Sequence, residues 1–283
     1  MGEKEVERRE ILKQDMALQP IGIVHSNVSE TSNLSIQGVE SEIEIFDQFA
    51  DGLKGIEECS HIFVLCWLHQ CDRDRLLVKP RKVTEKLPAR GVFTLRSNVR
   101  PNPISLTPTK LVRRRGNRLK VIIDVIDKTP VIDIKGYLPG WDSVGSAQID
   151  YMTPIYLRLS DTQLVEALTS EAINFHGEKC VALTIGVKIA LRVMRIMNTG
   201  MRDPKLKISM KTGGCFIDTV QGFSGATVGN GRLTTERIDA RDEYLVFIRE
   251  DQRIRVNLKS YSHLTPDQTK MMDSNSIFTI IKE

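Results

Sequence analysis

Residues 104–127 read "ISLTPTKLVRRRGNRLKVIIDVID", two runs rich in β-branched residues on either side of the tripeptide Arg115-Gly116-Asn117. Gly and Asn favour the left-handed backbone of tight turns, so this stretch predicts a β-hairpin. Working outward, short runs of the same kind recur at residues 21–28, 39–46, 61–70, 91–97 and 131–138. We expect residues 61–70 to form a fully buried strand. Many strands with little room for helix predict a compact barrel or sandwich up to about Tyr156.

The pattern changes after residue 158. Residues 160–175 open with a Ser-Asp cap and have helical apolar spacing, and residues 178–198 share that spacing. Three further segments are expected to be strands: "LKISMKTGGCFIDTV", "EYLVFIRE" and "RIRVNLKSYS". The sequence therefore predicts a mainly β amino-terminal barrel followed by an α+β domain. We expect a charged extension at 1–18, the barrel at 19–158 and the second domain at 159–283.

The composition is typical of a soluble globular protein. The chain has 283 residues, of which 41% are hydrophobic and 27% charged. Its longest apolar run, Ile62–Leu68, is far shorter than the ~20 residues that cross a bilayer, so no membrane association is expected. The first twenty residues lack the apolar core of a secretory signal, which favours the cytoplasm. Five cysteines, an odd number, favour free thiols over a disulfide framework.

Charge is distributed unevenly along the chain. Residues 21–70 hold eight acidic side chains against Lys54 alone, whereas residues 71–120 hold fifteen Lys and Arg against three acids. Such asymmetry is typical of a surface that binds a polyanion, because each neutralised phosphate releases a counterion. Within the basic window, Arg113, Arg114 and Arg115 are consecutive candidates for phosphate contacts. A merely solvated basic surface is the alternative.

The segment "RGVFTLRSNVRPNPISLT" (90–107) places three arginines beside a proline-stiffened turn. Each proline fixes its own φ and pushes the preceding residue toward extended backbone, so Arg100 follows a defined path. A buried guanidinium without a partner is strongly destabilising, which predicts that Arg90, Arg96 and Arg100 border a cavity that receives an anion. Internal pairing with Asp127 or Asp133 is the alternative.

Two other segments carry polar side chains at positions that favour a site. His69 and Gln70 directly follow the apolar run 61–68. Asp133, Lys135 and Tyr137 alternate along a predicted strand and so lie on one of its faces. A face with a carboxylate, an ammonium and a phenol is not core, so it lines a site or the surface.

Five blocks in order, "IGIVHS", "GVE", "GLKGIEECSHIFVLCWLHQ", "RGVFTLRSNVRPNPISLT" and "DKTPVIDIKGYLP", resemble the TsaA-like family across about residues 19–145. That family methylates N6 of threonylcarbamoyladenosine beside the anticodon of certain tRNAs, with S-adenosylmethionine as the donor. The resemblance implies a small β-barrel that forms a homodimer, with the donor in a pocket near the junction between its two copies.

The resemblance also implies site residues. The donor-binding residues would be His69, Gln70, Arg96, Ser97, Arg100, Asn102 and Ile104. The catalytic residues would be Tyr137, Asp133 and Lys135, and our hypothesis is that Tyr137 or Asp133 orients the N6 hydrogen. Arg90, Arg113, Arg114 and Arg115 would contact tRNA.

The sequence departs from the family pattern at four positions. Leu95 replaces a small polar residue, Lys128 a turn glycine, Gly136 a proline and Ser105 a glycine. None of these changes removes a charged site residue, but together they leave the acceptor open.

The second half resembles the E-type family associated with formylmethanofuran dehydrogenase over about residues 165–260, through "FHGEKCVALTIGVKIALRVM" and "GGCFIDTVQGFSGATVGNGRL". Metal binding is associated with some members. His176, Cys180 and Cys215 are retained, and they could share one metal such as zinc. Three other motif positions differ: Glu178, Ala226 and Asn230. Buried, inert thiols are the alternative.

Other interpretations remain open at the level of sequence. The loop "GFSGATVGNGRL" (222–233) could cradle a phosphate on its amides, or its glycines could simply permit turns. The leading hypothesis for function is a tRNA methyltransferase. The alternatives are a non-catalytic protein that binds the donor or a metal, and a methyltransferase acting on a small carboxylate-bearing cofactor.

Overall fold

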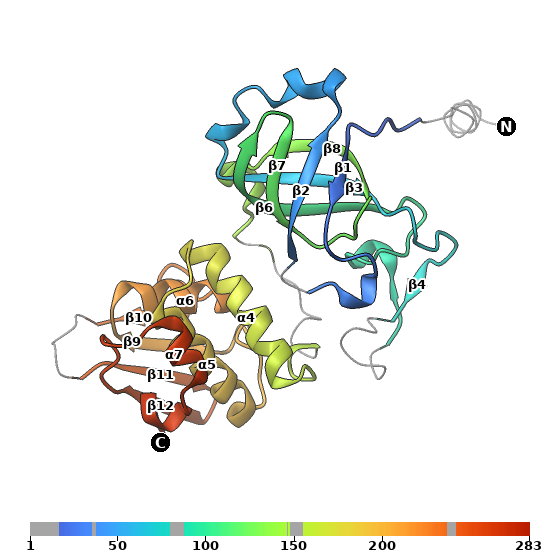
Figure 1. Cartoon of the computed structure of the whole chain (residues 1–283). Coiled ribbons are helices and arrows are strands. Elements are labelled where there is room, and N and C mark those ends of the chain that lie inside the picture. Colours follow the sequence, from blue (N-terminus) through green and yellow to red (C-terminus); the bar gives the residue numbers. More distant parts are fainter. Residues whose placement is uncertain (1–16, 36–37, 80–87, 146, 148–154, 237–241) are drawn as a thin grey trace. The chain divides into compact units, whose positions relative to one another are not determined.

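A computed structural model describes residues 17–35, 38–79, 88–145, 147, 155–236 and 242–283. The chain forms two compact units, one from Met1–Val78 and Arg90–Asp142 and the other from Lys79–Ala89 and Ser143–Glu283 (Figure 1). The domain limits expected near residues 18 and 158 stay predictions. Among the described residues, no helix combines the length and the apolarity that crossing a membrane requires.

The first unit is a closed six-stranded antiparallel barrel with the strand order β1-β2-β7-β6-β3-β8 (Figure 1). Its strands are β1 (Gly22–His25), β2 (Val39–Ile45), β3 (His61–Trp67), β6 (Ile104–Arg115), β7 (Arg118–Ile123) and β8 (Pro130–Gly136). The hairpin predicted from residues 104–127 is confirmed as β6 and β7, and Gly116 takes φ +58° in its turn. The barrel, the first of the two predicted architectures, is the correct one.

Short elements connect the barrel strands. They are the 3₁₀ helices η1 (Thr31–Asn33), η2 (Asp47–Leu53), η3 (Ile56–Glu58) and η4 (Val92–Thr94), the two-stranded sheet β4 (Leu77–Val78) with β5 (Arg90–Gly91), and α2 (Pro139–Asp142). The strand predicted at residues 91–97 is therefore wrong beyond Gly91, because the chain turns into η4. Its apolar residues serve a loop instead of a ladder.

The interior of the barrel is filled by alternate side chains of its strands. Val24, Ile43, Val64, Leu119 and Val121 are among the residues with no exposed surface. The expectation that residues 61–70 are buried on both faces is wrong, since β3 ends at Trp67 and alternates between buried and partly exposed positions. A strand in a barrel has one inward face, so its outward side chains remain accessible.

Much of the charge asymmetry of the sequence is neutralised on the outside of the barrel. Strands β2 and β7 are paired, and Lys120 contacts Glu40 at 2.5 Å while Arg118 contacts Glu42 at 2.6 Å and Glu44 at 2.9 Å. Opposite charges at neighbouring positions of adjacent strands stabilise the pairing modestly. Part of the basic window therefore belongs to the sheet and not to a polyanion-binding surface.

The second unit is α+β, as predicted. Its five-stranded sheet has the order β10-β9-β11-β12-β13, with β9 (Lys207–Lys211), β10 (Leu233–Thr235), β11 (Tyr244–Arg249), β12 (Gln252–Leu258) and β13 (Phe278–Lys282). Its helices are α4 (Asp161–His176), α5 (Val181–Met197), α6 (Gly214–Ser224), α7 (Pro266–Met271) and α8 (Ser274–Ile277). The Ser160 cap is confirmed, because its hydroxyl accepts a hydrogen bond from the Gln163 amide in a capping box. A strand over all of "LKISMKTGGCFIDTV" is wrong, since β9 ends at Lys211 and α6 begins at Gly214.

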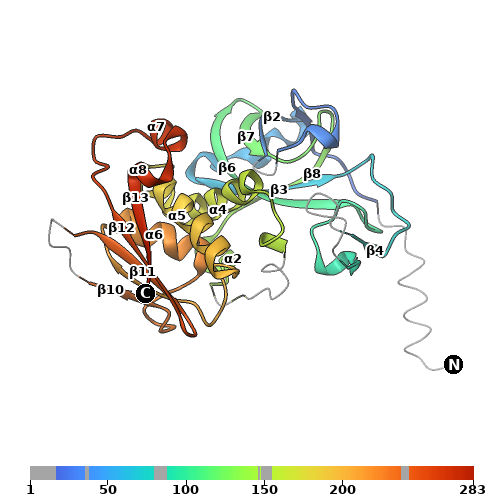
Figure 2. The ribbon, with the colours of Figure 1, turned by 90° about the horizontal axis from the view of Figure 1, so that it is seen from below.

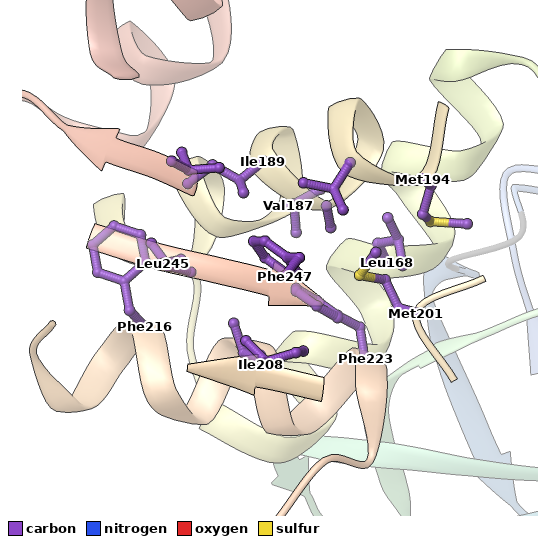
Figure 3. Close-up of a cluster of buried hydrophobic side chains, with 14 of the residues drawn as sticks. Leu168, Val187, Ile189, Met194, Met201, Ile208, Phe216, Phe223, Leu245 and Phe247 are labelled. Atoms are coloured by element: carbon purple, nitrogen blue, oxygen red, sulfur yellow. The ribbon is translucent and has the colours of Figure 1, made fainter. Parts of the chain in front are cut away.

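One face of this sheet and the helices enclose the core. Figure 3 shows Phe216 and Phe223 of α6 close to Phe247 of β11 and Ile208 of β9. All four side chains are essentially inaccessible to solvent. Aromatic side chains of this size supply a large apolar area, so they dominate the energetics of the core.

Close packing between α4 and α6 requires a glycine. A Cβ added at Gly222 would lie 3.0 Å from the Cα of Ala172 and 2.9 Å from the Cβ of Phe175. We expect Gly222→Ala to lower the free energy of unfolding by about 1–3 kcal/mol, because backbone atoms must move apart. Gly214→Ala in the same helix is the control, since a Cβ there meets nothing within 4 Å. Urea denaturation measures both, and equal stabilities of the two variants would contradict the packing argument.

Candidate functional site

His69 and Gln70 lie where the chain leaves β3, beside a small cavity at that end of the barrel. The cavity is also lined by Asn98 from the arginine-rich loop, and by Asp124 and Thr129 from the segment between β7 and β8. Three separate parts of the chain thus meet around one concavity. The last three residues carry no sequence motif, so only the closure of the barrel reveals their place in the site.

The arginine-rich loop is held by one of its own arginines. The Arg100 guanidinium donates hydrogen bonds to the backbone oxygens of Ser97 at 2.7 Å, Val92 at 3.0 Å and Leu95 at 2.5 Å. These carbonyls belong to a loop without a strand ladder, so the guanidinium supplies donors that the backbone lacks. This geometry makes Arg100 a positioning residue of the loop. The predicted alternative, pairing with Asp127 or Asp133, is not what the structure contains.

The remaining loop residues are more accessible. Arg96 is exposed and donates a long hydrogen bond of 3.4 Å to the backbone oxygen of Leu106. The Ser97 hydroxyl accepts a hydrogen bond from the Val99 amide, and the Asn102 backbone oxygen accepts one from Ile104. Arg90 lies in β5, paired with Val78. The guanidinium of Arg96 is therefore available to an anion in a way that the guanidinium of Arg100 is not.

Asp133, Lys135 and Tyr137 follow one another along the outward face of β8. The Lys135 ammonium is 2.6 Å from the Asp133 carboxylate, and the Tyr137 ring packs 5.2 Å from that of Phe63 on β3. The Tyr137 amide donates to the backbone oxygen of His61, at the start of β3.

Within one chain, these three side chains are far from His69. The start and end of β3 are separated by roughly 20 Å, at ~3.3 Å per residue, and His69 lies beyond Trp67. The two groups of predicted site residues therefore do not converge on one cavity. Asp133 instead borders a second cavity, of about 550 Å³, together with Gln48, Asp51, Lys54 and Cys59.

The three consecutive arginines differ from one another. Arg114 pairs with Glu57 at 2.7 Å and also donates to the backbone oxygen of Leu53 at 2.8 Å. Arg113 and Arg115 are exposed on the outside of β6. Arg114 thus ties the hairpin to η2 and η3, while its two neighbours remain accessible.

The second unit brings His176, Cys180 and Cys215 together. Their potential ligand atoms all lie within 4.8 Å of one another, and the Cys180 sulfur is 3.4 Å from Nε2 of His176. His176 ends α4, Cys180 is the N-cap of α5, and Cys215 lies in the first turn of α6. Donors around a tetrahedral zinc are about 3.3–3.8 Å apart, so a small contraction would allow this set to hold a metal.

A carboxylate orients the histidine of this cluster. Nδ1 of His176 lies 3.1 Å from Oδ2 of Asp218, one turn after Cys215 on α6. This contact leaves Nε2 directed toward the sulfurs, as in the carboxylate–histidine–metal arrangement of many metal sites. Desolvation and the neighbouring Cys180 raise the pKa of the Cys215 thiol. Sequence reasoning missed Asp218, although its spacing of three from Cys215 places both on one helix face.

The other thiols are inert or isolated. All five cysteines are free, which confirms the prediction. Burial raises the pKa of the Cys66 thiol to about 12, so this residue is a core side chain and not a nucleophile.

The glycine-rich loop at 222–233 does not present a phosphate cradle. The Asn230 side-chain oxygen accepts hydrogen bonds from the amides of Thr227 and Arg232, and the Ala226 amide donates to the Ser224 hydroxyl. The Gly225 and Gly231 amides bond to backbone oxygens. Amides that are already bonded within the loop are not available to a phosphate, so the glycines serve turns.

Comparison with known proteins agrees with the barrel and its blocks. The sequence profile of the tRNA-methyltransferase O N-terminal domain matches residues 23–143. An S-adenosyl-L-methionine-binding protein of Archaeoglobus fulgidus is 46% identical over 138 residues, which cover 97% of that protein and 47% of this chain. The chain belongs to the tRNA-methyltransferase O family. This membership confirms the first resemblance inferred from the sequence.

The family relationship covers the two parts of the chain differently. A probable S-adenosyl-L-methionine-binding protein of the same archaeon is 37% identical over 226 residues, 76% of this chain but only 60% of that protein. A tRNA-methyltransferase O crystal structure from Pseudomonas aeruginosa has 29% identity over 48% of this chain and 62% of that one, with a TM-score of 0.39. The profile of FmdE, from the molybdenum formylmethanofuran dehydrogenase operon, matches residues 175–277 and confirms the second resemblance.

The arginine-rich loop of this family member provides a test of its internal clamp. We expect Arg100→Ala to lower the free energy of unfolding by about 1–3 kcal/mol, because several loop carbonyls lose their donor. Arg96→Ala is the control, and we expect a change below about 0.5 kcal/mol because Arg96 is exposed and makes one long bond. Thermal and urea unfolding measure both. Equal effects of the two substitutions would contradict the clamp.

Proposed function

We propose that the chain is an S-adenosylmethionine-dependent methyltransferase, whose acceptor is N6 of threonylcarbamoyladenosine next to the anticodon of tRNA. The family match over residues 23–143 carries this proposal, together with the blocks that include the predicted site residues. The names of the relatives describe binding of the donor, which supports the first part. A tRNA acceptor also favours a cytoplasmic protein.

In this proposal the donor lies by the loop that Arg100 positions. His69 and Gln70 contact it from the end of β3, and Ser97, Asn102 and Ile104 from the loop, while Arg96 offers a guanidinium to its carboxylate. The sulfonium loses its charge as the methyl group leaves, so orientation of donor and acceptor supplies much of the rate acceleration. Effective molarities in well-oriented systems correspond to at most ~7–11 kcal/mol.

The acceptor nitrogen needs orientation more than strong acid–base help. The Asp133 carboxylate is held by Lys135, and the Tyr137 ring is fixed against Phe63. Either Asp133 or Tyr137 can then accept the hydrogen bond of the N6 hydrogen in a fixed direction. Arg113, Arg115 and Arg90 are proposed as phosphate contacts, with Arg114 supporting the hairpin.

We further propose that the barrel acts as a homodimer. His69 and Tyr137 are separated along β3 in a single chain, so a donor pocket near both requires a second copy. The outward face around Tyr137 is apolar: Leu106, 48% exposed, lies opposite Leu65 on the neighbouring strand, next to Phe63. An accessible apolar face of this kind is suited to burial against a partner.

The enzymatic proposal is tested with radiolabelled S-adenosylmethionine and tRNA that carries threonylcarbamoyladenosine. We expect label in one methylated nucleoside after digestion, and we expect Tyr137→Phe or Asp133→Asn to lower kcat by about 100-fold with donor affinity retained. Arg192→Gln, on α5 of the second unit, is the control. If tRNA stays unlabelled while the donor binds, the protein is a donor-binding protein. If a small-molecule fraction is labelled, the acceptor is a carboxylate-bearing cofactor.

We also propose that His176, Cys180 and Cys215 bind zinc in the second unit. The mixed nitrogen and sulfur donors suit zinc, and the Asp218 contact on the opposite ring nitrogen supports the arrangement. When bound, zinc would act as a Lewis acid or as a structural link between α4, α5 and α6. The alternative from sequence, a set of inert thiols, makes no use of the oriented histidine.

The zinc proposal predicts about one zinc per chain by elemental mass spectrometry. We expect Cys180→Ser and Cys215→Ser to lose the metal, and Asp218→Asn to weaken zinc affinity by about 10- to 100-fold, because the histidine loses its orientation. Cys71→Ser is the matched control, since Cys71 lies in the other unit. A zinc content that does not differ among these variants would refute the site.

A further inference from the structure

The five-stranded sheet of the second unit has one face that helices do not cover. Figure 2 shows α4, α5 and α6 on the same side of this sheet. Residues 245, 247, 254 and 256 point to that side and are buried in the core. Because side chains alternate along a strand, residues 244, 246, 248, 253, 255 and 257 point to the opposite side, which we call the open face.

The register of the strands places residues of the open face in rows. Tyr244 on β11 lies between Lys211 on β9 and Asn257 on β12. Val246 lies between Ser209 and Arg255 in the next row. Cationic side chains therefore flank a central apolar strip from both sides.

The last row has the same composition. Ile248 lies between Lys207 and Arg253. Across the three rows, the positions on β9, β11 and β12 hold four cations and no carboxylate. The carboxylates at the margin are Glu283, which is 2.5 Å from Arg253, and Glu236, which accepts a hydrogen bond from the Tyr244 hydroxyl at 3.0 Å.

Two cations of the open face are not neutralised. The Arg255 guanidinium lies 3.9 Å from the centre of the Tyr244 ring and donates to the Asn257 side-chain oxygen at 2.9 Å, and neither partner is charged. Among the described residues, Lys207 makes no ion pair, and its side chain is exposed. The stacked pair of Arg255 and Tyr244 adds a flat, preorganised surface beside these charges.

We propose that the open face binds RNA, with Lys207 and Arg255 contacting phosphates and Tyr244 offering its ring and Arg255 its guanidinium plane to an unpaired base. This inference rests on the proposed function, because it assigns the second unit a part in holding the tRNA. Cations beside an aromatic platform on an open sheet are the chemistry that single-stranded RNA recognises. Hydroxyl and amide groups, from Ser209 and Asn257, complete the set of donors for sugar and phosphate oxygens.

A second copy of this chain fits the open face less well. In a two-fold symmetric contact the same patch meets itself, so the cationic rows would face cationic rows. Like charges brought together across an interface are unfavourable. A polyanion meets no such repulsion.

The test compares two charge-matched double variants of the full-length protein. Lys207→Gln with Arg255→Gln removes two cations from the open face, and Arg192→Gln with Lys270→Gln removes two exposed cations from α5 and α7. Binding of a fluorescein-labelled tRNA is followed by anisotropy over a range of salt concentrations. The first variant is expected to bind roughly ten- to a hundredfold more weakly at about 0.1 M salt, with the slope of log K against log salt lower by about two. The control is expected to stay within about threefold of the unchanged protein.

Equal losses in the two variants would overturn the inference, because they would report net charge and not a surface. A change in sedimentation of the first variant, with tRNA binding intact, would assign the open face to self-association and overturn it too. Thermal unfolding and donor binding of both variants exclude misfolding.

The outcome is separable from that of the proposed function. If tRNA binding depends on Lys207 and Arg255 but no nucleoside is methylated, the open face stands and the enzymatic proposal fails. If methylation proceeds with an unchanged KM for tRNA in the first variant, the open face fails while the enzymatic proposal stands.

Discussion

Closure of the amino-terminal barrel is the constraint on which the rest of the first unit depends. β1 pairs with both β2 and β8, so the sheet has no free edge and every barrel strand presents one face to a sealed interior. That interior accepts only apolar side chains such as Val64 and Leu119. All polar chemistry is therefore confined to the outer face and to the ends, where the loops emerge.

The ends of the barrel impose a second demand, because loop carbonyls there have no ladder partners. Arg100 meets this demand for the arginine-rich loop with its guanidinium. A permanent charge close to the donor pocket thus serves the backbone first, and ligand binding benefits through the fixed position of Asn98 beside His69. On the outer face, the carboxylates of β2 and the cations of β7 neutralise one another.

In the second unit, helix packing assembles the polar cluster. Gly222 allows α6 to approach α4 closely, and the contact aligns the start of α6 with the end of α4. Cys215 and Asp218 on α6 consequently meet His176, which is about forty positions earlier in the chain. One sheet face is used for this core, and the other remains available for a ligand.

The sequence by itself determined the type of most elements, the hairpin at Gly116, the Ser160 cap and the residues that carry chemistry, because periodicity and capping are local properties of the chain. It was misleading at residues 91–97 and 212–220, where apolar residues that fit a strand serve a 3₁₀ turn and a helix that pack on distant elements. Only the tertiary structure decided that Arg100 binds carbonyls, that Asn98, Asp124 and Thr129 join His69, and that Tyr137 lies at the other end of β3. These outcomes depend on strand register and barrel closure, which arise from contacts between residues far apart in the chain.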